Sequence, residues 1–161
     1  MAIGEFVYRR RVQYKETDAS GIVHFSMFFV FAEEAEHAMW RDVGLSVEPH
    51  AAEIGWPRVS ASFDFLRALR FEDEIEVRLR VIGKTAKTFR YQAIIVHNGR
   101  YAAAGTMTTI CVSKRPDQPL RAIAIPREIA DRFAIVEPLE IPGRPGTDSR
   151  AATLDPLIPG P

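Results

Sequence analysis

A carboxylate close to the start of an apolar helix is the feature of this sequence with the clearest chemical potential. Asp18 lies in a turn over residues 17–21, and a helix is predicted to begin shortly afterwards, at His24–Ser26. The free N–H groups and partial positive charge of a helix N-terminus can polarise a carbonyl oxygen where water is scarce. A carboxylate beside that carbonyl could attack it or activate a water molecule. The structural alternative is an Asx turn, in which Asp18 accepts hydrogen bonds from Ser20 and Gly21.

Two elements must hold this turn in place. Residues Phe6–Tyr14 alternate apolar and polar side chains, which predicts a strand. Arg9–Arg11 are expected to be its solvated edge, with Arg10 on the opposite face from its two neighbours. The helix is predicted to end at Val43, and its first half, Phe25–Ala32, is apolar on nearly every face. Other elements must therefore wrap around it.

The rest of the domain is predicted to be mainly strands. After Pro57, period-two alternation indicates four strands joined by tight turns, and Asn98-Gly99 is a strong hairpin signal. These strands are expected at residues 58–69, 74–82, 87–96 and 100–112, with a short helix at 126–133. Together with the first strand, they predict an α+β domain in which a five-stranded antiparallel sheet curls around one long central helix.

Length and composition exclude several classes of protein. The chain has 161 residues, of which 47% are hydrophobic and 26% charged, as in a soluble protein with one domain. Its longest uncharged runs, Ala19–Ala32 and Tyr101–Ser113, are shorter than the roughly 18–20 residues of a membrane span. The 21 basic and 21 acidic side chains balance, which argues against a general nucleic-acid binder.

The chain ends and the single cysteine add further expectations. No signal-peptide pattern precedes the first strand, so a cytoplasmic protein is expected. Cys111 excludes an internal disulfide framework and is interpreted as a small core residue. Six of the eleven prolines lie from Pro138 onward. Residues 1–137 are therefore predicted to form the domain, and residues 138–161 a flexible tail with little to bury.

The stretch Val12–Ser26 and the helix after it carry a motif that is fairly specific for one family. Its residues are Tyr14, Thr17, Asp18, Gly21, Ile22, Val23, Phe25, Phe28, Phe29, Phe31 and Glu33. In these residues the chain resembles hotdog-fold acyl-CoA thioesterases of the 4-hydroxybenzoyl-CoA thioesterase family. The resemblance is close over Val12–Leu45, weaker over the strands, and ends before the tail.

The resemblance implies a fold, a reaction and a set of site residues. It implies the hotdog fold and the hydrolysis of an acyl-CoA thioester, with Asp18 as nucleophile or general base. The Phe25 N–H would bind the thioester oxygen, and Gly21 would let the chain approach the substrate. The acyl pocket would be lined by Phe25, Met27, Phe28 and Phe29. The phosphates of coenzyme A would be bound by basic residues near the start of a strand, Lys84, Lys87 and Arg90, whose alternative role is that of solvated strand ends.

The resemblance also bears on cofactors and partners. Coenzyme A would be part of the substrate, and neither a separate cofactor nor a metal is expected. The expected assembly is a homodimer formed by joining sheets edge to edge, or a homotetramer. The acyl pocket would then lie against the partner chain.

Two departures from the family pattern leave alternatives open. Many members have asparagine where this chain has Met27, and some have histidine at the position of Phe25, whereas here the histidine is His24. His24 is therefore either catalytic or a packed neighbour of the site. Glu33 or Glu34 would pair with a basic side chain or order a water molecule. Two other functions remain: a hotdog dehydratase that uses His24, and a non-catalytic acyl-binding or scaffold protein.

Overall fold

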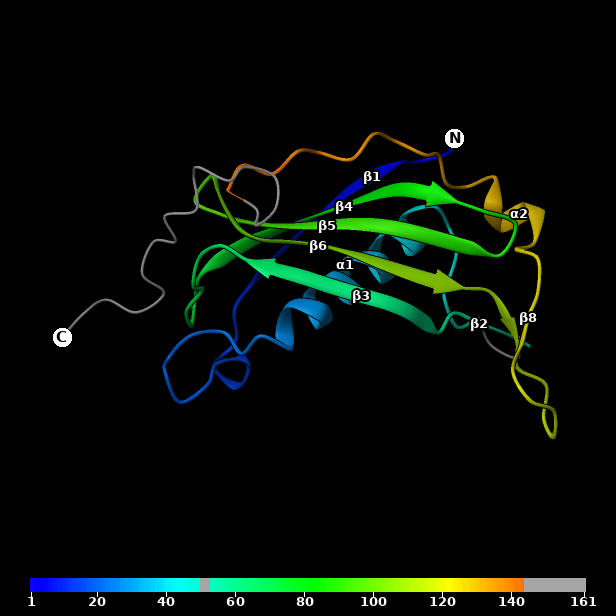
Figure 1. Ribbon diagram of the computed structural model, residues 1–161, viewed down its shortest axis with the longest axis horizontal. Coiled ribbons are helices and arrows are strands. Elements are labelled where there is room, and N and C mark those ends of the chain that lie inside the picture. The colour runs from blue at the N-terminus through cyan, green and yellow to red at the C-terminus, as the bar shows by residue number, and fades with distance from the viewer. Residues whose placement is uncertain (50–52, 144–161) are drawn as a thin grey trace.

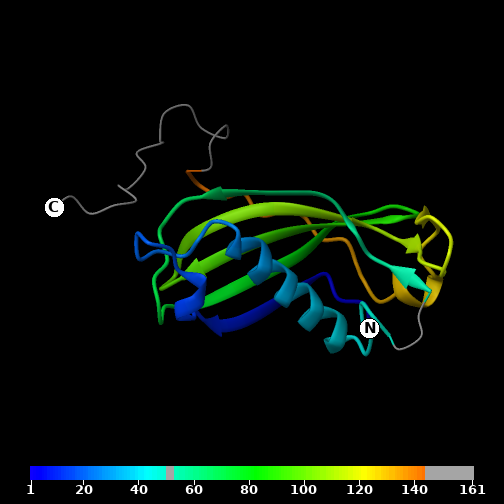
Figure 2. The same ribbon diagram turned by 90° about the horizontal axis from the view of Figure 1, so that it is seen from below.

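One long helix lies across the concave face of a curved antiparallel sheet. The computed structural model describes residues 1–49 and 53–143. The helix is α1 (Met27–Asp42), and Figures 1 and 2 show the sheet curving around it. In spatial order the strands are β1 (Glu5–Arg11), β4 (Glu74–Lys84), β5 (Thr88–His97), β6 (Arg100–Ile110) and β3 (Arg58–Phe65). The predicted sheet and central helix are confirmed.

Short elements complete the described chain. They are η1 (Tyr14–Glu16), β2 (Ile54–Gly55), β7 (Val112–Ser113), β8 (Arg121–Ala122) and α2 (Arg127–Ala130). β2, β7 and β8 form a small second sheet. Among the described residues, no helix combines the length and the hydropathy that crossing a membrane would require.

The order of the strands differs from a simple succession of hairpins. β4, β5 and β6 do follow one another through tight turns, and Asn98 and Gly99 both adopt positive φ, of 48° and 72°. β3, however, pairs with β6 and lies at the opposite edge from β1, so residues 66–73 must cross between β3 and β4. The expectation of a tight turn there is wrong, because alternation identifies a strand but does not say which strand it pairs with.

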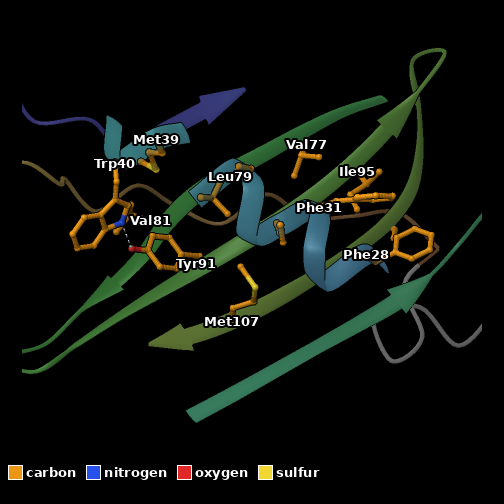
Figure 3. Packing of buried hydrophobic residues seen from close by; sticks show 14 of the residues in the cluster. Phe28, Phe31, Met39, Trp40, Val77, Leu79, Val81, Tyr91, Ile95 and Met107 are labelled. Atoms are coloured by element: carbon orange, nitrogen blue, oxygen red, sulfur yellow. Dashed lines mark hydrogen bonds between the residues drawn. The ribbon is translucent and has the colours of Figure 1, made fainter. Parts of the chain in front are cut away.

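The core lies between α1 and the inner face of the sheet. On β4 the buried residues Ile75, Val77, Leu79 and Val81 alternate with Glu76, Arg78 and Arg80, as the sequence predicts. They meet buried side chains of α1, including Phe31 and Met39 (Figure 3). Burial of one such side chain stabilises the fold by about 1.5–3 kcal/mol. This packing fixes the axis of α1 relative to the sheet.

The C-terminal segment covers part of the outer face of the sheet. The side chain of Gln92 exchanges two hydrogen bonds with the backbone of Leu139, at 2.7 and 2.8 Å. Ile141 is 4% exposed and packs with Ile94, Val96 and Ala104. The first six residues of the expected free tail, 138–143, thus lie on the sheet, because β5 is apolar on both faces and offers Ile141 a site. Residues 144–161 of the expected tail lie outside the described residues.

A substitution in this segment should destabilise the protein. Ile141→Ala is expected to cost about 2 kcal/mol of unfolding free energy and to lower Tm by roughly 4–8 °C. Leu139→Ala is the matched control, since Leu139 is exposed and contributes backbone atoms to its bonds with Gln92. Calorimetry of both variants measures the difference. Equal shifts for the two would show that Ile141 does not anchor the segment.

Candidate active site

The turn that carries Asp18 is a small closed loop between β1 and α1. The N–H of Asp18 donates to the carbonyl of Ile22 at 2.8 Å, and the N–H of Gly21 donates to the carbonyl of Asp18 at 3.0 Å. A β-bridge between Thr17 and Val23 closes the loop at its base. Asp18 is thereby held a few residues before the first turn of α1.

The Asp18 carboxylate has one occupied and one available oxygen. Its Oδ1 accepts the N–H of Ser20 at 2.8 Å, which is the Asx turn considered from the sequence. Its Oδ2 has no hydrogen-bond partner within residues 1–49 and 53–143, and the side chain is partly exposed. The Asx turn orients the carboxylate and leaves one oxygen for chemistry, so the two interpretations are compatible.

Gly21 adopts a backbone conformation that suits glycine. Its φ is +76°, in the left-handed region, and a Cβ there would lie 3.9 Å from the guanidinium of Arg70. The residues after Gly21 are held in place at Val23, whose N–H donates to the carbonyl of Leu69 at 2.8 Å. Gly21 therefore forms the bend that brings the chain back toward α1.

The start of α1 carries a free backbone donor. Met27 N–H donates to the carbonyl of His24 at 2.9 Å, and Phe28 N–H to the carbonyl of Phe25 at 3.4 Å. The N–H of Phe25 itself finds no acceptor in the described part of the chain. Ser26 occupies the cap position without a capping side-chain bond. The first turn thus combines a free N–H with the positive end of the helix dipole.

His24 interacts with its own neighbours along the chain. Its Nδ1 lies 2.7 Å from Ser26 Oγ and accepts the Ser26 N–H at 3.3 Å. The ring also lies against Phe25, with centroids 4.5 Å apart. His24 is therefore an exposed residue whose contacts with Phe25 and Ser26 stabilise the start of α1.

The predicted acyl-pocket residues separate into buried and accessible groups. Phe28 is buried and packs edge-on against Phe65, with centroids 5.0 Å apart. Phe29 is half-buried against Phe63 at 5.1 Å, and Met27 is also half-buried. Phe25 is 61% exposed. The accessible apolar surface therefore begins at Phe25 and follows α1 toward β3.

The predicted phosphate-binding residues lie at the other end of the sheet. β4 starts at Glu74, which pairs with Arg11 near the Asp18 loop, and ends at Lys84. Lys84 Nζ donates to the carbonyls of Ala130 and Phe133, each at 2.9 Å. Lys87 and Arg90 lie beside it at the β4–β5 turn, far from the blue Asp18 loop in Figure 1. Within one chain these residues lie far from Asp18. Their predicted role in binding the phosphates of coenzyme A therefore requires a second chain, whose basic residues would reach the Asp18 site of the first.

A buried arginine beside the site departs from the expected solvated edge. Arg10 lies on the inner face of β1, and its side chain is 10% exposed. It forms ion pairs with Glu16 at 2.5 Å and with Glu34 at 2.7 Å. The signal for this placement was the alternation itself, which puts Arg10 on the same face as the aromatic residues Phe6 and Tyr8.

A second ion pair lies farther along α1. Arg58 donates to Glu36, and Glu33 lies 4.0 Å from the same guanidinium, beside a groove of about 320 Å³. Burial alone would lower the pKa of Arg58, but the hydrogen bond and charge of Glu36, with the charge of Glu33, outweigh it and raise that pKa.

Burial and the charge of Glu36 raise the pKa of Tyr91 well above its ordinary value, so Tyr91 stays a neutral acceptor for the Trp40 N–H.

Known proteins share both the sequence pattern and the fold. Residues 12–133 match the model of the thioesterase-like superfamily. The 1,4-dihydroxy-2-naphthoyl-CoA hydrolase of Trichodesmium erythraeum is 30% identical over 112 residues, which cover 66% of this chain and 81% of that enzyme. A protein of Aquifex aeolicus, provisionally named an esterase, is 32% identical over 136 residues, covering 78% of this chain and 95% of that protein. The solved structure of a gentisyl-coenzyme A thioesterase superposes with a TM-score of 0.73 at 27% identity, covering 80% of this chain and 100% of that one.

These similarities define the class of the protein. A five-stranded antiparallel sheet wrapped around one helix, shared with solved thioesterases, is the hotdog fold. The chain belongs to the thioesterase-like superfamily, and it is a thioester hydrolase. The resemblance noted in the Asp18 motif is thereby confirmed.

Proposed function

We propose that this protein hydrolyses an acyl-CoA thioester to a free carboxylic acid and coenzyme A at the Asp18 loop. The observation that carries the proposal is that one short segment, from Asp18 to Phe25, holds both an available carboxylate oxygen and an unbonded backbone N–H at the start of α1. Such a pair can act on the two ends of one carbonyl group. The Phe25 N–H and the helix dipole stabilise the oxyanion, and Asp18 acts at the carbonyl carbon.

The reaction can follow two routes that use the same residues. Asp18 accepts a proton from water as the water oxygen bonds to the acyl carbon, or its carboxylate bonds to that carbon first. In both routes the C–S bond breaks, the thiolate of coenzyme A leaves and takes up a proton, and water supplies the oxygen of the product acid. Neither route uses a cofactor beyond the coenzyme A of the substrate.

We propose an aromatic acyl group as the first substrate class to test. Phe25, Met27 and Phe29 offer an accessible apolar surface at the start of α1, which follows the Asp18 loop in the chain. Two relatives are named for aromatic acyl-CoA substrates, 1,4-dihydroxy-2-naphthoyl-CoA and gentisyl-CoA. Flat rings pack well on such side chains.

A hydrolysis panel tests the proposed function. Purified protein is given benzoyl-, short-chain and medium-chain acyl-CoA, and the release of the free thiol of coenzyme A is followed. Turnover with the highest kcat/KM for the aromatic thioester is expected. Binding of these thioesters without turnover would instead support an acyl-binding protein, and dehydration of a 3-hydroxyacyl-CoA, or hydration of the matching enoyl-CoA, would support a dehydratase.

The exposed edge of β3 supports a second part of the proposal, a dimer. β3 has a strand neighbour on one side, β6, and Val59–Ser62 along it are exposed, with Val59 at 58%. β1, the other edge strand, carries Glu5 and Arg9–Arg11, and charged residues discourage strand pairing. The exposed stretch Val59–Ser62 of β3 carries no charge and therefore suits pairing with a second copy of this chain.

We expect light scattering at micromolar concentration to give a mass of at least two chains. Ala61→Lys places a charge on the β3 edge and should shift the protein toward the monomer. Val7→Lys on exposed β1 is the matched control and should leave the mass unchanged. A wild-type monomer with full activity would contradict the dimer and the site shared with it.

A further inference from the structure

Arg10 connects the loop that carries Asp18 to the helix that carries the oxyanion donor. Its Nη2 donates to Glu16 Oε1 at 2.5 Å, and its Nη1 donates to both oxygens of Glu34, at 2.8 and 2.7 Å. The guanidinium also lies over the ring of Phe31, 4.4 Å from its centroid. Glu34 and Phe31 both belong to α1, so the Arg10 side chain on β1 binds the helix through one ion pair and one cation–π contact.

Glu16 bonds to both ends of the segment that carries Asp18, at Gln13 and at His24. Its side chain is 3% exposed, and its Oε2 accepts the N–H of Gln13 at 2.8 Å. Its backbone carbonyl accepts the N–H of His24 at 2.9 Å. Glu16 therefore holds the two ends of the segment from Gln13 to His24 together, and the bonds of Arg10 attach Glu16 to α1.

We propose that Arg10 is a positioning residue for thioester hydrolysis, which holds the Asp18 carboxylate at a fixed place relative to the Phe25 N–H. This proposal rests on the proposed function, because it takes Asp18 as the reacting group. The planar guanidinium bonds two carboxylates in fixed directions at once, which the single ammonium of lysine does not reproduce. A displacement of about 1 Å at a reacting group can cost on the order of 10²-fold in rate.

The first test compares Arg10 with its neighbour on the same strand. Arg10→Met should lower kcat by roughly ten- to a hundredfold and change KM by less than about threefold, since the guanidinium acts through Glu16 and Glu34. Arg10→Lys should not restore the rate. Arg9→Met is the control, because Arg9 is 75% exposed and pairs with Glu76, and it should stay near wild type. Native kcat in folded Arg10→Met would overturn the proposal.

A double variant separates positioning from general loss of stability. If Arg10 acts through Asp18, adding Arg10→Met to Asp18→Asn should lower kcat little beyond Asp18→Asn alone. A loss that adds in full would overturn the proposal. If Asp18→Asn alone keeps native turnover, the proposed function fails, whereas the amide-exchange measurement below still reports on the loop.

Hydrogen exchange of the backbone amides gives the readout that does not depend on activity. Arg10→Met should speed exchange in residues 13–24 and leave β4 and β5 protected, as local opening does. Equal acceleration in the loop and the sheet would mean a global effect and would overturn the proposal. Where Arg10→Met does not fold, Glu34→Gln keeps Arg10 and Glu16 paired and weakens one link. It should show the same pattern with a smaller loss, about five- to tenfold.

Discussion

Asp18→Asn is expected to lower kcat by at least about a hundredfold, with a modest change in KM. Losing a general base typically costs about 10²–10⁴ in rate, which corresponds to roughly 3–5.5 kcal/mol of barrier. The effect falls on kcat because the carboxylate acts mainly in the transition state. The amide can still accept the Ser20 N–H that Oδ1 accepts now, so the turn should keep its shape. Steady-state kinetics measure the loss of kcat, and the melting temperature shows whether the fold is retained.

His24→Gln provides the comparison at the same loop. His24 bonds to Ser26 and packs on Phe25, so its loss should loosen the first turn of α1 and cost about tenfold in kcat. If Asp18→Asn keeps near-native turnover and His24→Gln abolishes it, the acid–base roles are reversed. A dehydratase-like use of His24 would then be the better account.

Gly105→Ala is expected to cost about 3 kcal/mol of unfolding free energy, at the upper end of the usual range for overpacked sites. A Cβ at Gly105 would lie 2.0 Å from the carbonyl oxygen of Ser62 and 2.8 Å from the ring of Phe63. β3 would have to move away from β6, and Phe63, which packs on Phe29, would move with it. The variant should therefore lose activity as well as stability.

Gly83→Ala is the matched control for this effect. Gly83 also lies in a strand, but a Cβ there would lie 3.2 Å from the Cβ of Arg90, so a far smaller displacement relieves the contact than at Gly105, where the nearest atom is at 2.0 Å. Chemical denaturation of both variants should show a large loss for Gly105→Ala and less than about 1 kcal/mol for Gly83→Ala. Similar losses at the two positions would contradict the close approach of β3 and β6.

Local patterns in the sequence predicted the elements better than their partners. The alternation in β4 and the Asn98-Gly99 turn were sufficient to identify strands and a hairpin, because both signals depend on neighbouring residues. The pairing of β3 with β6 depends on residues far apart in the chain, and no local pattern encodes it. The packing of Ile141 on β5 was missed for the same reason, since a low average apolar content says nothing about one well-placed side chain.

The candidate site follows the same division. The Asp18 turn and the start of α1 were predicted because the loop is local and its residue types are distinctive. The ion pairs of Arg10 with Glu16 and Glu34 join three elements, so the alternation along β1 predicts only the face on which Arg10 lies. Lys84, Lys87 and Arg90 lie at the opposite end of the sheet from Asp18, so any role for them depends on a partner chain.

A crystal structure of the Asp18→Asn variant with bound benzoyl-CoA would show directly whether Asp18 and Phe25 form the site. The substitution slows turnover, so the intact thioester can be trapped in the site. We expect the thioester oxygen to lie about 2.7–3.1 Å from the Phe25 nitrogen, with the introduced amide beside the carbonyl carbon. Benzoyl-CoA bound with its thioester away from this loop, or with its carbonyl oxygen directed to other donors, would contradict the assignment of Asp18 and Phe25.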